Sequence, residues 1–344
     1  MPQPTHVVRP GRASTAARTA GLLVAVGGLV VLGLLSIWLG SKDIPFTSTW
    51  NVLWTNDGSN DAVVIHEYRI PRTLLGMLVG AALGVAGALM QALTRNPLAD
   101  PGLLGITMGA STGVVISLAF FGISSVLGYV WFAFAGAAVA SVVVYALGSS
   151  GRRDATPERL VLAGAAVTAV AFAFNSAVLL MDPEAFDEYR FWQVGSLAGR
   201  YYGVLVPVLP FIVVGLVVAL LLIRPLNALA MGEDLGRALG AHPDRIRAGG
   251  AIAITLLCGA ATAAVGPIGF VGLAVPHMAR LIAGPDQRWV LPYSLVLAPL
   301  LLVGADILGR VIPPTAEIQV GIVTAAIGVP VFIALCRKRK LASL

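Results

Sequence analysis

The sequence predicts an all-α protein that crosses a membrane about ten times, with both termini in the cytoplasm. Of its 344 residues, 57% are hydrophobic and only 12% are charged, and uncharged stretches of bilayer-spanning length recur along the chain. A helix needs about 20 apolar residues to cross the hydrocarbon core. So few charged side chains could not cover a soluble domain of this size, which excludes an ordinary cytosolic enzyme and a nucleic-acid-binding domain. We therefore expect a multi-pass protein of the cell (inner or cytoplasmic) membrane.

The predicted spans follow the uncharged stretches in chain order. The stretch 103–148 is long enough for two spans, with a break between Gly122 and Gly128. The stretch 248–279 is long for one span and short for two, so we expect a full span, a break at Gly266-Pro267 and a short or broken span. The other spans are expected at 21–40, 73–94, 160–181, 201–223, 290–308 and 318–336.

The basic residues set the orientation. With the N-terminus inside, ten spans place 17 of the 23 Lys and Arg residues in the cytoplasm and 6 outside. Cytoplasmic loops of membrane proteins carry such an excess, so the net charge of +6 reflects orientation rather than a nucleic-acid partner. Residues 1–20 are then expected to form a mobile basic tail, 21–336 a transmembrane domain, and 337–344 a second basic tail, with both tails in the cytoplasm.

Neither the cysteines nor the lysines form a catalytic or metal-binding pattern. Cys258 and Cys336 lie in apolar runs, where we expect buried small hydrophobes rather than a disulfide or a zinc site. Lys42, Lys338 and Lys340 follow none of the glycines that a phosphate-binding loop requires. We expect no catalytic residue, metal or cofactor on this chain, and an energy source on another polypeptide. The spans also lack the carboxylate chain of a proton relay, which disfavours a proton- or sodium-driven carrier.

Two cytoplasmic segments are informative. RNPLADPG at 95–102 has a stiff, non-helical composition, and a matching Gly/Pro break occurs at 266–277. Because the spans before these breaks cross in opposite directions, the halves 73–181 and 248–336 are expected to form an inverted repeat with a transport pathway between them. The segment 224–247 has a helical apolar stripe. It is either a solvated amphipathic loop or a docking element for a cytoplasmic partner.

The order of these motifs resembles the iron-siderophore and vitamin B12 permease family, the membrane subunits of type II ATP-binding-cassette importers. The matching stretches are 69–110 (RIPRTLLGMLVGAALGVAGALMQALTRNPLADPGLLGITMGA), FWQVGSL (191–197), LNALAMGEDLGRALG (226–240), GPIGFVGLAVPHMARLIAGPDQRWVLP (266–292) and 305–332 with ADILGR and EIQVGIVTAAIGVPVF. The resemblance implies a ten-helix importer fold and a dimer of identical or different permease subunits. Two ATP-binding subunits, which hold ATP and Mg, would bind inside, and an extracytoplasmic binding protein would deliver a ferric siderophore or a haem- or cobalamin-type chelate.

The resemblance also implies roles for single residues. Arg69, Arg72 and Arg310 match external positions that receive acidic residues of the binding protein in relatives, although such arginines can also snorkel to the membrane interface. The cytoplasmic gate is expected at Asn96, Leu98, Thr156 and Pro157. Contacts that couple the chain to the ATPase are expected at Gly232, Glu233, Leu235, Arg237, Leu239 and Gly240.

Some features depart from the family or leave alternatives open. Pro157 and Glu158 stand where relatives often have small hydroxyl residues, and Gln319 stands where the family usually has Pro. The acidic segment 182–188 could contact substrate or a partner, or be solvated. One competing function is a stand-alone secondary carrier for a small solute. The other is a membrane enzyme or scaffold, and the enzyme would need the catalytic pattern that the sequence lacks.

Overall fold

The computed structural model describes residues 14–55, 57–149, 157–238, 240–312 and 316–339, and these residues form helices and no strand. The elements before residue 150 are α1 (Thr15–Trp38), α2 (Phe46–Trp54), α3 (Asn60–Val63), the π-helical turn η1 (Val64–Arg69), α4 (Ile70–Leu93), the 3-10 turn η2 (Pro101–Leu104), α5 (Ile106–Phe121) and α6 (Val126–Ser149). They are followed by α7 (Pro157–Met181), α8 (Pro183–Gln193), α9 (Tyr202–Leu221), α10 (Ile223–Ala230), α11 (Glu233–Ala238), α12 (Pro243–Val265), α13 (Val271–Ala283), α14 (Gln287–Val311) and α15 (Val320–Arg339).

Seven of the described helices are long and apolar enough to cross a membrane: α1, the continuous helix Asn60–Leu93, α6, α7, α9, α12 and α14. Three shorter apolar helices, α5, α13 and α15, fall where the sequence predicts the remaining spans. The chain is thus an all-helical, multi-pass membrane protein. The count of ten spans stays a prediction, since α5 and α13 have only 16 and 13 residues. The side of the membrane on which the termini lie also stays a prediction.

The breaks inside the two long apolar stretches are confirmed. Gly122, with φ +63°, ends α5, and α6 begins four residues later at Val126. Gly266 ends α12 with φ +80°, a backbone conformation that favours glycine, and Phe270 also has a positive φ. In both places the helix ends at the glycine because the glycine itself adopts a positive φ, outside the right-handed helical region.

Two helices begin where the sequence suggested tail or loop. α1 begins at Thr15, inside the expected tail, because Ser14 Oγ accepts a hydrogen bond from Ala17 N and caps the helix. The rest of that tail, residues 1–13, lies outside the described residues, as do residues 340–344 of the second tail. The acidic segment 182–188 lies in α8, which Asp182 caps by accepting from Ala185 N at 3.0 Å.

The centre of the bundle is built on α4, α12 and α14, whose most apolar windows are 83%, 67% and 67% buried, whereas α1 is only 11% buried. α4 and α12 are antiparallel, because Leu93 at the end of α4 packs on Gly250 near the start of α12. Gly87 of α4 lies so close to α13 that a Cβ atom there would be 1.8 Å from the carbonyl oxygen of Gly272. The order long buried helix, break, short helix therefore occurs twice in opposite directions, in agreement with the expected repeat.

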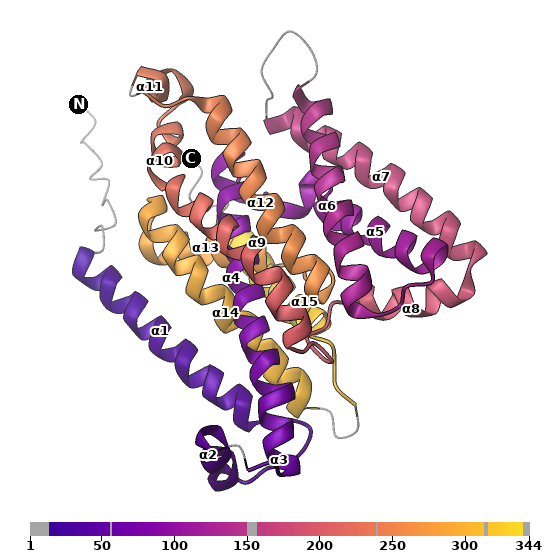
Figure 1. The fold of residues 1–344 in the computed structure, drawn as a ribbon. Coiled ribbons are helices and arrows are strands. Elements are labelled where there is room, and N and C mark those ends of the chain that lie inside the picture. The colour runs from indigo at the N-terminus through magenta and orange to yellow at the C-terminus, as the bar shows by residue number, and fades with distance from the viewer. Residues whose placement is uncertain (1–13, 56, 150–156, 239, 313–315, 340–344) are drawn as a thin grey trace.

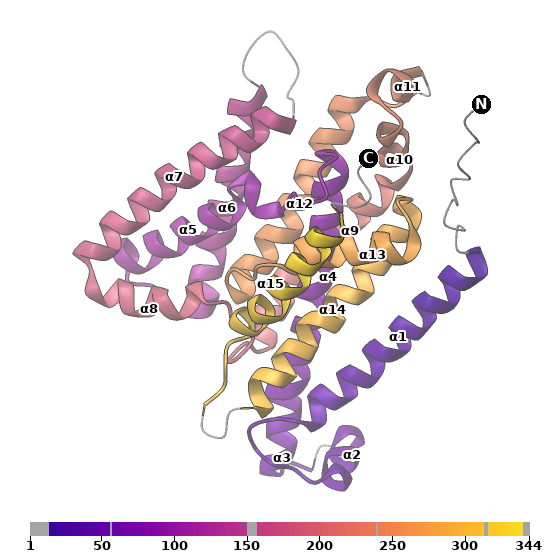
Figure 2. The ribbon, with the colours of Figure 1, turned by 180° about the vertical axis from the view of Figure 1, so that it is seen from behind.

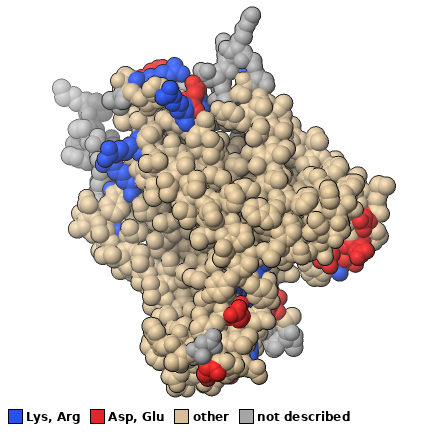
Figure 3. All heavy atoms as spheres, in the orientation of Figure 1, with Lys and Arg blue, Asp and Glu red and all other residues tan. Residues whose placement is uncertain are grey.

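The molecule has two polar ends separated by an apolar belt. α10 and α11 lie at one end, which we call the α10 end, and α2 and α3 lie at the other, which we call the α2 end (Figures 1 and 2). In the space-filling view, basic side chains gather near α10 and α11 with a few acidic ones among them, acidic side chains lie near α8 and at the α2 end, and uncharged surface separates the two ends (Figure 3). This distribution fits a protein that crosses an apolar layer.

Candidate functional site

At the α2 end, a cluster of charged side chains joins α4 to α14. Arg72 of α4 donates from Nε and Nη2 to the carboxylate of Asp306 at 3.1 and 2.8 Å, and from Nη1 to Glu317 Oε2 at 2.7 Å. Asp306 Oδ2 also forms an ion pair with Arg310 Nη2, 3.1 Å away and one turn further along α14. One buried carboxylate thus holds two guanidinium groups, and Glu317 adds a second carboxylate from the segment before α15.

Two of the predicted docking arginines also fasten the end of α1. Arg69 donates from Nη1 to the carbonyl oxygen of Ile37 at 3.0 Å, and also to the carbonyl oxygens of Trp38 and Lys42. Arg310 donates to Ser36 Oγ at 2.7 Å and to the Ser36 carbonyl oxygen at 3.1 Å. Arg69 and Arg310 are only 5% and 4% exposed. The structure therefore brings the three predicted arginines together, but most of their donors bind within the chain, unlike those of arginines that snorkel to water.

A cleft of about 570 Å³ opens beside this cluster, and its walls include Lys42, Tyr68, Arg72, Tyr201 and Glu317. The side chains of Glu317 and Arg72 are 30% and 13% exposed, so this ion pair is the part of the cluster that water reaches most easily. Burial would raise the pKa of Glu317, but the charge and hydrogen bond of Arg72, together with smaller contributions from Ser41 and Arg310, hold this pKa below its ordinary value. Glu317 is therefore ionised at neutral pH.

At the α10 end, the turn after α4 contains the first predicted gate. Asn96 Oδ1 accepts from Leu98 N at 2.9 Å, and Asp100 Oδ1 accepts from Gly102 N at 2.8 Å, so two side chains fix the turn. Leu98 is 47% exposed, in agreement with a position on a surface or pathway. Of the second predicted gate, Pro157 begins α7, and Thr156 lies outside the described residues.

The expected coupling segment forms the two short helices α10 and α11. α10 buries Leu226 and Leu229, whereas Leu235 on α11 is 52% exposed and Arg237 is exposed too. The segment is thus a folded surface element rather than a solvated loop. Positive φ values at Gly232 and Gly240 allow the chain to turn on either side of α11, Glu233 is the first residue of that helix, and Leu239 lies outside the described residues.

Hydrogen bonds that the sequence does not reveal join this segment to its neighbours. Arg95 Nη2 donates to the carbonyl oxygen of Leu229 at 2.8 Å, which links the gate turn to α10. Asn227 Nδ2 donates to Asp286 Oδ1 at 2.7 Å, and Asn227 Oδ1 accepts from the amide nitrogen of Gln287 at 3.0 Å. α10 is therefore fastened to both α4 and α14. The sequence carries a signal for the Asp306–Arg310 pair, four residues apart on one helix, but none for these links.

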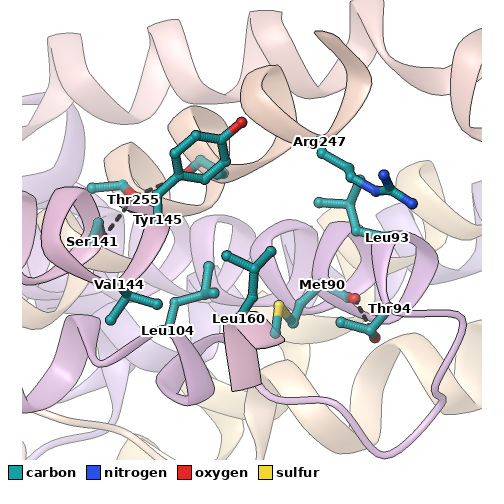
Figure 4. A pocket seen from close by; sticks show the side chains of 11 residues that line it. Met90, Leu93, Thr94, Leu104, Ser141, Val144, Tyr145, Leu160, Arg247 and Thr255 are labelled. Atoms are coloured by element: carbon teal, nitrogen blue, oxygen red, sulfur yellow. Dashed lines mark hydrogen bonds between the residues drawn. The ribbon is translucent and has the colours of Figure 1, made fainter. Parts of the chain in front are cut away.

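A small cavity lies between α4, α6, α7 and α12, near the gate turn (Figure 4). Its volume is about 40 Å³, and its wall surface is mostly apolar, although Thr94, Ser141, Tyr145, Arg247 and Thr255 also line it. Ligand pockets usually measure about 300–1,000 Å³. This cavity could hold a water molecule but no chelate, so it is not a transport pathway through this chain.

Comparison with known proteins agrees with this architecture. The pattern of the FecCD transport family matches residues 28–338. The chain is 48% identical over 320 residues to the ferric enterobactin transport system permease protein FepD of Escherichia coli (strain K12), which covers 92% of this chain and 96% of that protein. It is 40% identical over 311 residues to the Fe(3+)-citrate import system permease protein YfmD of Bacillus subtilis (strain 168), covering 90% and 92%.

Among solved structures, a metal-chelate type ABC transporter in an inward-facing conformation has a similar fold. The TM-score is 0.82 at 25% identity, over 93% of this chain and 99% of that chain. The family match extends over nearly all of the described helices, from within α1 to the last turn of α15, and so includes the charged cluster at the α2 end and the helices α10 and α11. This chain is therefore a member of the FecCD transport family of permease subunits.

Proposed function

We propose that this chain is the permease subunit of an ATP-driven importer that moves a ferric siderophore, or a haem- or cobalamin-type metal chelate, into the cytoplasm. The protein would lie in the cell membrane with the α10 end and both termini inside. The names of its relatives, which carry ferric enterobactin and Fe(3+)-citrate, support an iron chelate as cargo. The basic side chains near α10 and α11 support this orientation.

The observation that carries the proposal is the placement of two different polar sites at opposite ends of α4. Its first turn holds Arg72 in the charged cluster, and the turn after its last residue is bonded through Arg95 to α10. α4 is also the most deeply buried span among the described residues. A rigid central helix with a cationic site outside and a contact segment inside suits a subunit that connects an external receptor with an internal motor.

The internal motor would be two separate ATPase subunits, which hold ATP and Mg and seat α11 and the adjoining turns. Leu235 and Arg237 offer them one apolar and one basic side chain on an exposed helix. The gate residues Asn96 and Leu98 would then move with α10 through the Arg95 link. No catalytic role falls to this chain.

The external receptor would be a binding protein that presents an acidic side chain to the cleft beside Arg72. Because Arg69 and Arg310 are buried on backbone carbonyl oxygens, they would position the cluster while Arg72 makes the contact. Glu317 already occupies this position on Arg72, so the incoming carboxylate would replace an internal one. Exchange of one charge-assisted pair for another gives docking that is specific and reversible.

A second permease subunit, identical or different, would complete the pathway. The cavity between α4, α6, α7 and α12 is far too small for a chelate, which supports a route between this chain and another one. The more exposed spans α6, α7 and α9, at 28%, 17% and 28% buried, leave apolar surface for lipid and for such a partner.

Reconstitution tests the proposal. Vesicles that contain the permease with its ATPase, and that are supplied with binding protein and labelled ferric siderophore, should accumulate iron only when ATP is inside the compartment that holds the ATPase. The competing secondary carrier predicts accumulation by this chain alone under a proton gradient. Uptake without ATPase or nucleotide would overturn the importer proposal.

A further inference from the structure

The short helix α2 carries a row of exposed aromatic rings. Phe46, Trp50 and Trp54 are four residues apart and so share one face of the helix, where they are 56%, 49% and 72% exposed. The ring centroids of Phe46 and Trp50 are 6.2 Å apart, and those of Trp50 and Trp54 are 6.0 Å apart. No residue of α2 is charged. The row is thus a continuous, uncharged aromatic surface.

The opposite face of α2 fixes the direction of this row. Thr49 and Val52 are only 6% and 5% exposed, and Val52 packs in a small cluster with Ile44, Ala62 and Ile65. The Val52 carbonyl oxygen also contacts His66 Nε2 at 2.9 Å. Because one face is held against α3 and η1, the aromatic face must point away from the chain.

The row continues the surface of a spanning helix. Trp38, the last residue of α1, packs edge-to-face on Phe46 with ring centroids 5.4 Å apart. α1 has 24 residues and is 11% buried, and it exposes aliphatic side chains such as Leu23 and Val24. Such a helix is about 36 Å long against a hydrocarbon core of about 30 Å. A helix of this length can reach from one boundary of the bilayer to the other, which would put Trp38 and the start of the aromatic row at a boundary.

We infer that α2 is an interfacial membrane anchor whose Phe46, Trp50 and Trp54 insert into the phospholipid headgroup layer at the α2 end. Tryptophan favours this layer, because its ring is apolar and its N–H group can still reach water or a headgroup. An uncharged row that extends a lipid-facing helix fits phospholipid better than a soluble partner, which would be recognised here by the charged cluster instead.

The anchor has a consequence for the charged cluster. α2 is fastened to η1 through Val52 and His66, and η1 ends at Arg69. A membrane-bound α2 would hold the chain segment that leads into Arg69 and Arg72 at a fixed height above the bilayer. The inference goes beyond the import proposal and does not depend on an ATPase, a substrate or a binding protein.

Tryptophan fluorescence in bilayer nanodiscs tests the anchor. The full chain is incorporated into phosphatidylethanolamine/phosphatidylglycerol nanodiscs that contain lipids brominated near the headgroup or near the bilayer centre. The difference in emission between the wild type and the double variant Trp50→Phe/Trp54→Phe is the emission of these two rings. The matched control is Trp192→Phe, because Trp192 is 4% exposed and its emission should respond to neither lipid.

We expect the Trp50/Trp54 emission to be quenched about twofold more by bromine near the headgroup than by bromine at the centre, with little quenching by aqueous acrylamide. Quenching by acrylamide alone would place the rings in water and overturn the anchor. Insensitivity to both quenchers would mean that protein covers the row, such as a second copy of the chain, and would overturn it equally. A variant that fails to fold is recognised from loss of the Trp192 signal, and the two single Trp→Phe variants then supply the same comparison.

Discussion

Arg95 and Leu229 are joined by one hydrogen bond across two separate elements, from the arginine Nη2 to the leucine carbonyl oxygen at 2.8 Å. Arg95 has φ +50°, a left-handed conformation that is uncommon for residues other than glycine. The turn is thus held in a strained shape while it is bonded to α10. This contact connects the proposed ATPase-binding segment directly to the gate turn.

Replacement of Arg95 by Ala should separate ATP hydrolysis from transport. A hydrogen bond to a charged group contributes about 1.5–3 kcal/mol, so loss of this contact should lower uptake by about tenfold while the assembled complex still hydrolyses ATP within about twofold of wild type. The matched control is Arg288→Ala, which removes an exposed arginine at the same end. A parallel fall of hydrolysis and uptake would instead indicate loss of assembly and would contradict the role given to Arg95.

Asp306→Asn should destabilise the fold. The carboxylate is 3% exposed and neutralises both Arg72 and Arg310, so its removal leaves buried guanidinium groups without their counter-charge. Breaking a buried ion pair costs about 3–5 kcal/mol. The thermal midpoint in detergent should fall by several degrees. Asp187→Asn is the control, because Asp187 and Arg190 form an exposed pair that contributes roughly 0–1 kcal/mol. Equal midpoints for the two variants would contradict a structural role of Asp306.

Hydropathy and backbone chemistry make much of this fold predictable from sequence. The apolar stretches lie on helices, and the breaks at Gly122 and Gly266 occur where glycine allows a positive φ. Sequence also predicts that Arg69, Arg72 and Arg310 lie near one membrane boundary, and the structure brings them together. Sequence does not reveal that Arg69 and Arg310 bond to backbone carbonyl oxygens of residues about 30 to 270 positions away, because such contacts depend on tertiary packing.

This burial changes the way in which docking is best tested. From sequence, simultaneous charge reversal at Arg69, Arg72 and Arg310 is expected to abolish docking and leave the fold intact. In the structure, two of these arginines donate to backbone carbonyl oxygens at the end of α1, so their reversal would also damage that end. Arg72, whose side chain is 13% exposed, is the arginine that can be changed with the least disturbance of α1.

Glu317→Ala should strengthen docking of the binding protein. The variant removes the internal carboxylate from Arg72, so an incoming acidic side chain no longer has to displace it. Because charge-assisted contacts of this kind are strong, we expect the affinity of the binding protein to rise about tenfold. Titration of the binding protein onto the permease in nanodiscs measures this affinity. Lys42→Ala is a control at the same cleft, since Lys42 pairs with Asp61 instead. Unchanged or weaker binding by the Glu317 variant would contradict the exchange of carboxylates.

The same residue gives a defined pH dependence of stability. The pKa of Glu317 lies below its ordinary value of 4.5, so the folded state binds fewer protons there than the unfolded state. The contribution of the Arg72–Glu317 pair is therefore fully present above about pH 4.5 and is lost as the pH falls through the lower, folded-state pKa. The difference in thermal midpoint between wild type and Glu317→Gln should be constant from neutral pH to about 4.5 and shrink below it. A difference that grows with acidification would have the wrong sign.

The α10 end offers a test that separates assembly from folding. Leu235 is 52% exposed on α11, so a charge at this position should leave the permease folded. The test variant is Leu235→Asp together with Leu239→Asp, and its thermal midpoint reports folding; Leu239 lies outside the described part of the chain. If α11 seats in an apolar cleft of the ATPase, two buried charges would each cost several kcal/mol, and co-purification of the ATPase should fall by at least about a hundredfold. The control is Phe186→Asp on α8, which introduces a charge at a residue that is 48% exposed but lies outside the proposed coupling segment. Normal recovery of the ATPase with the double variant would place the motor elsewhere on this surface.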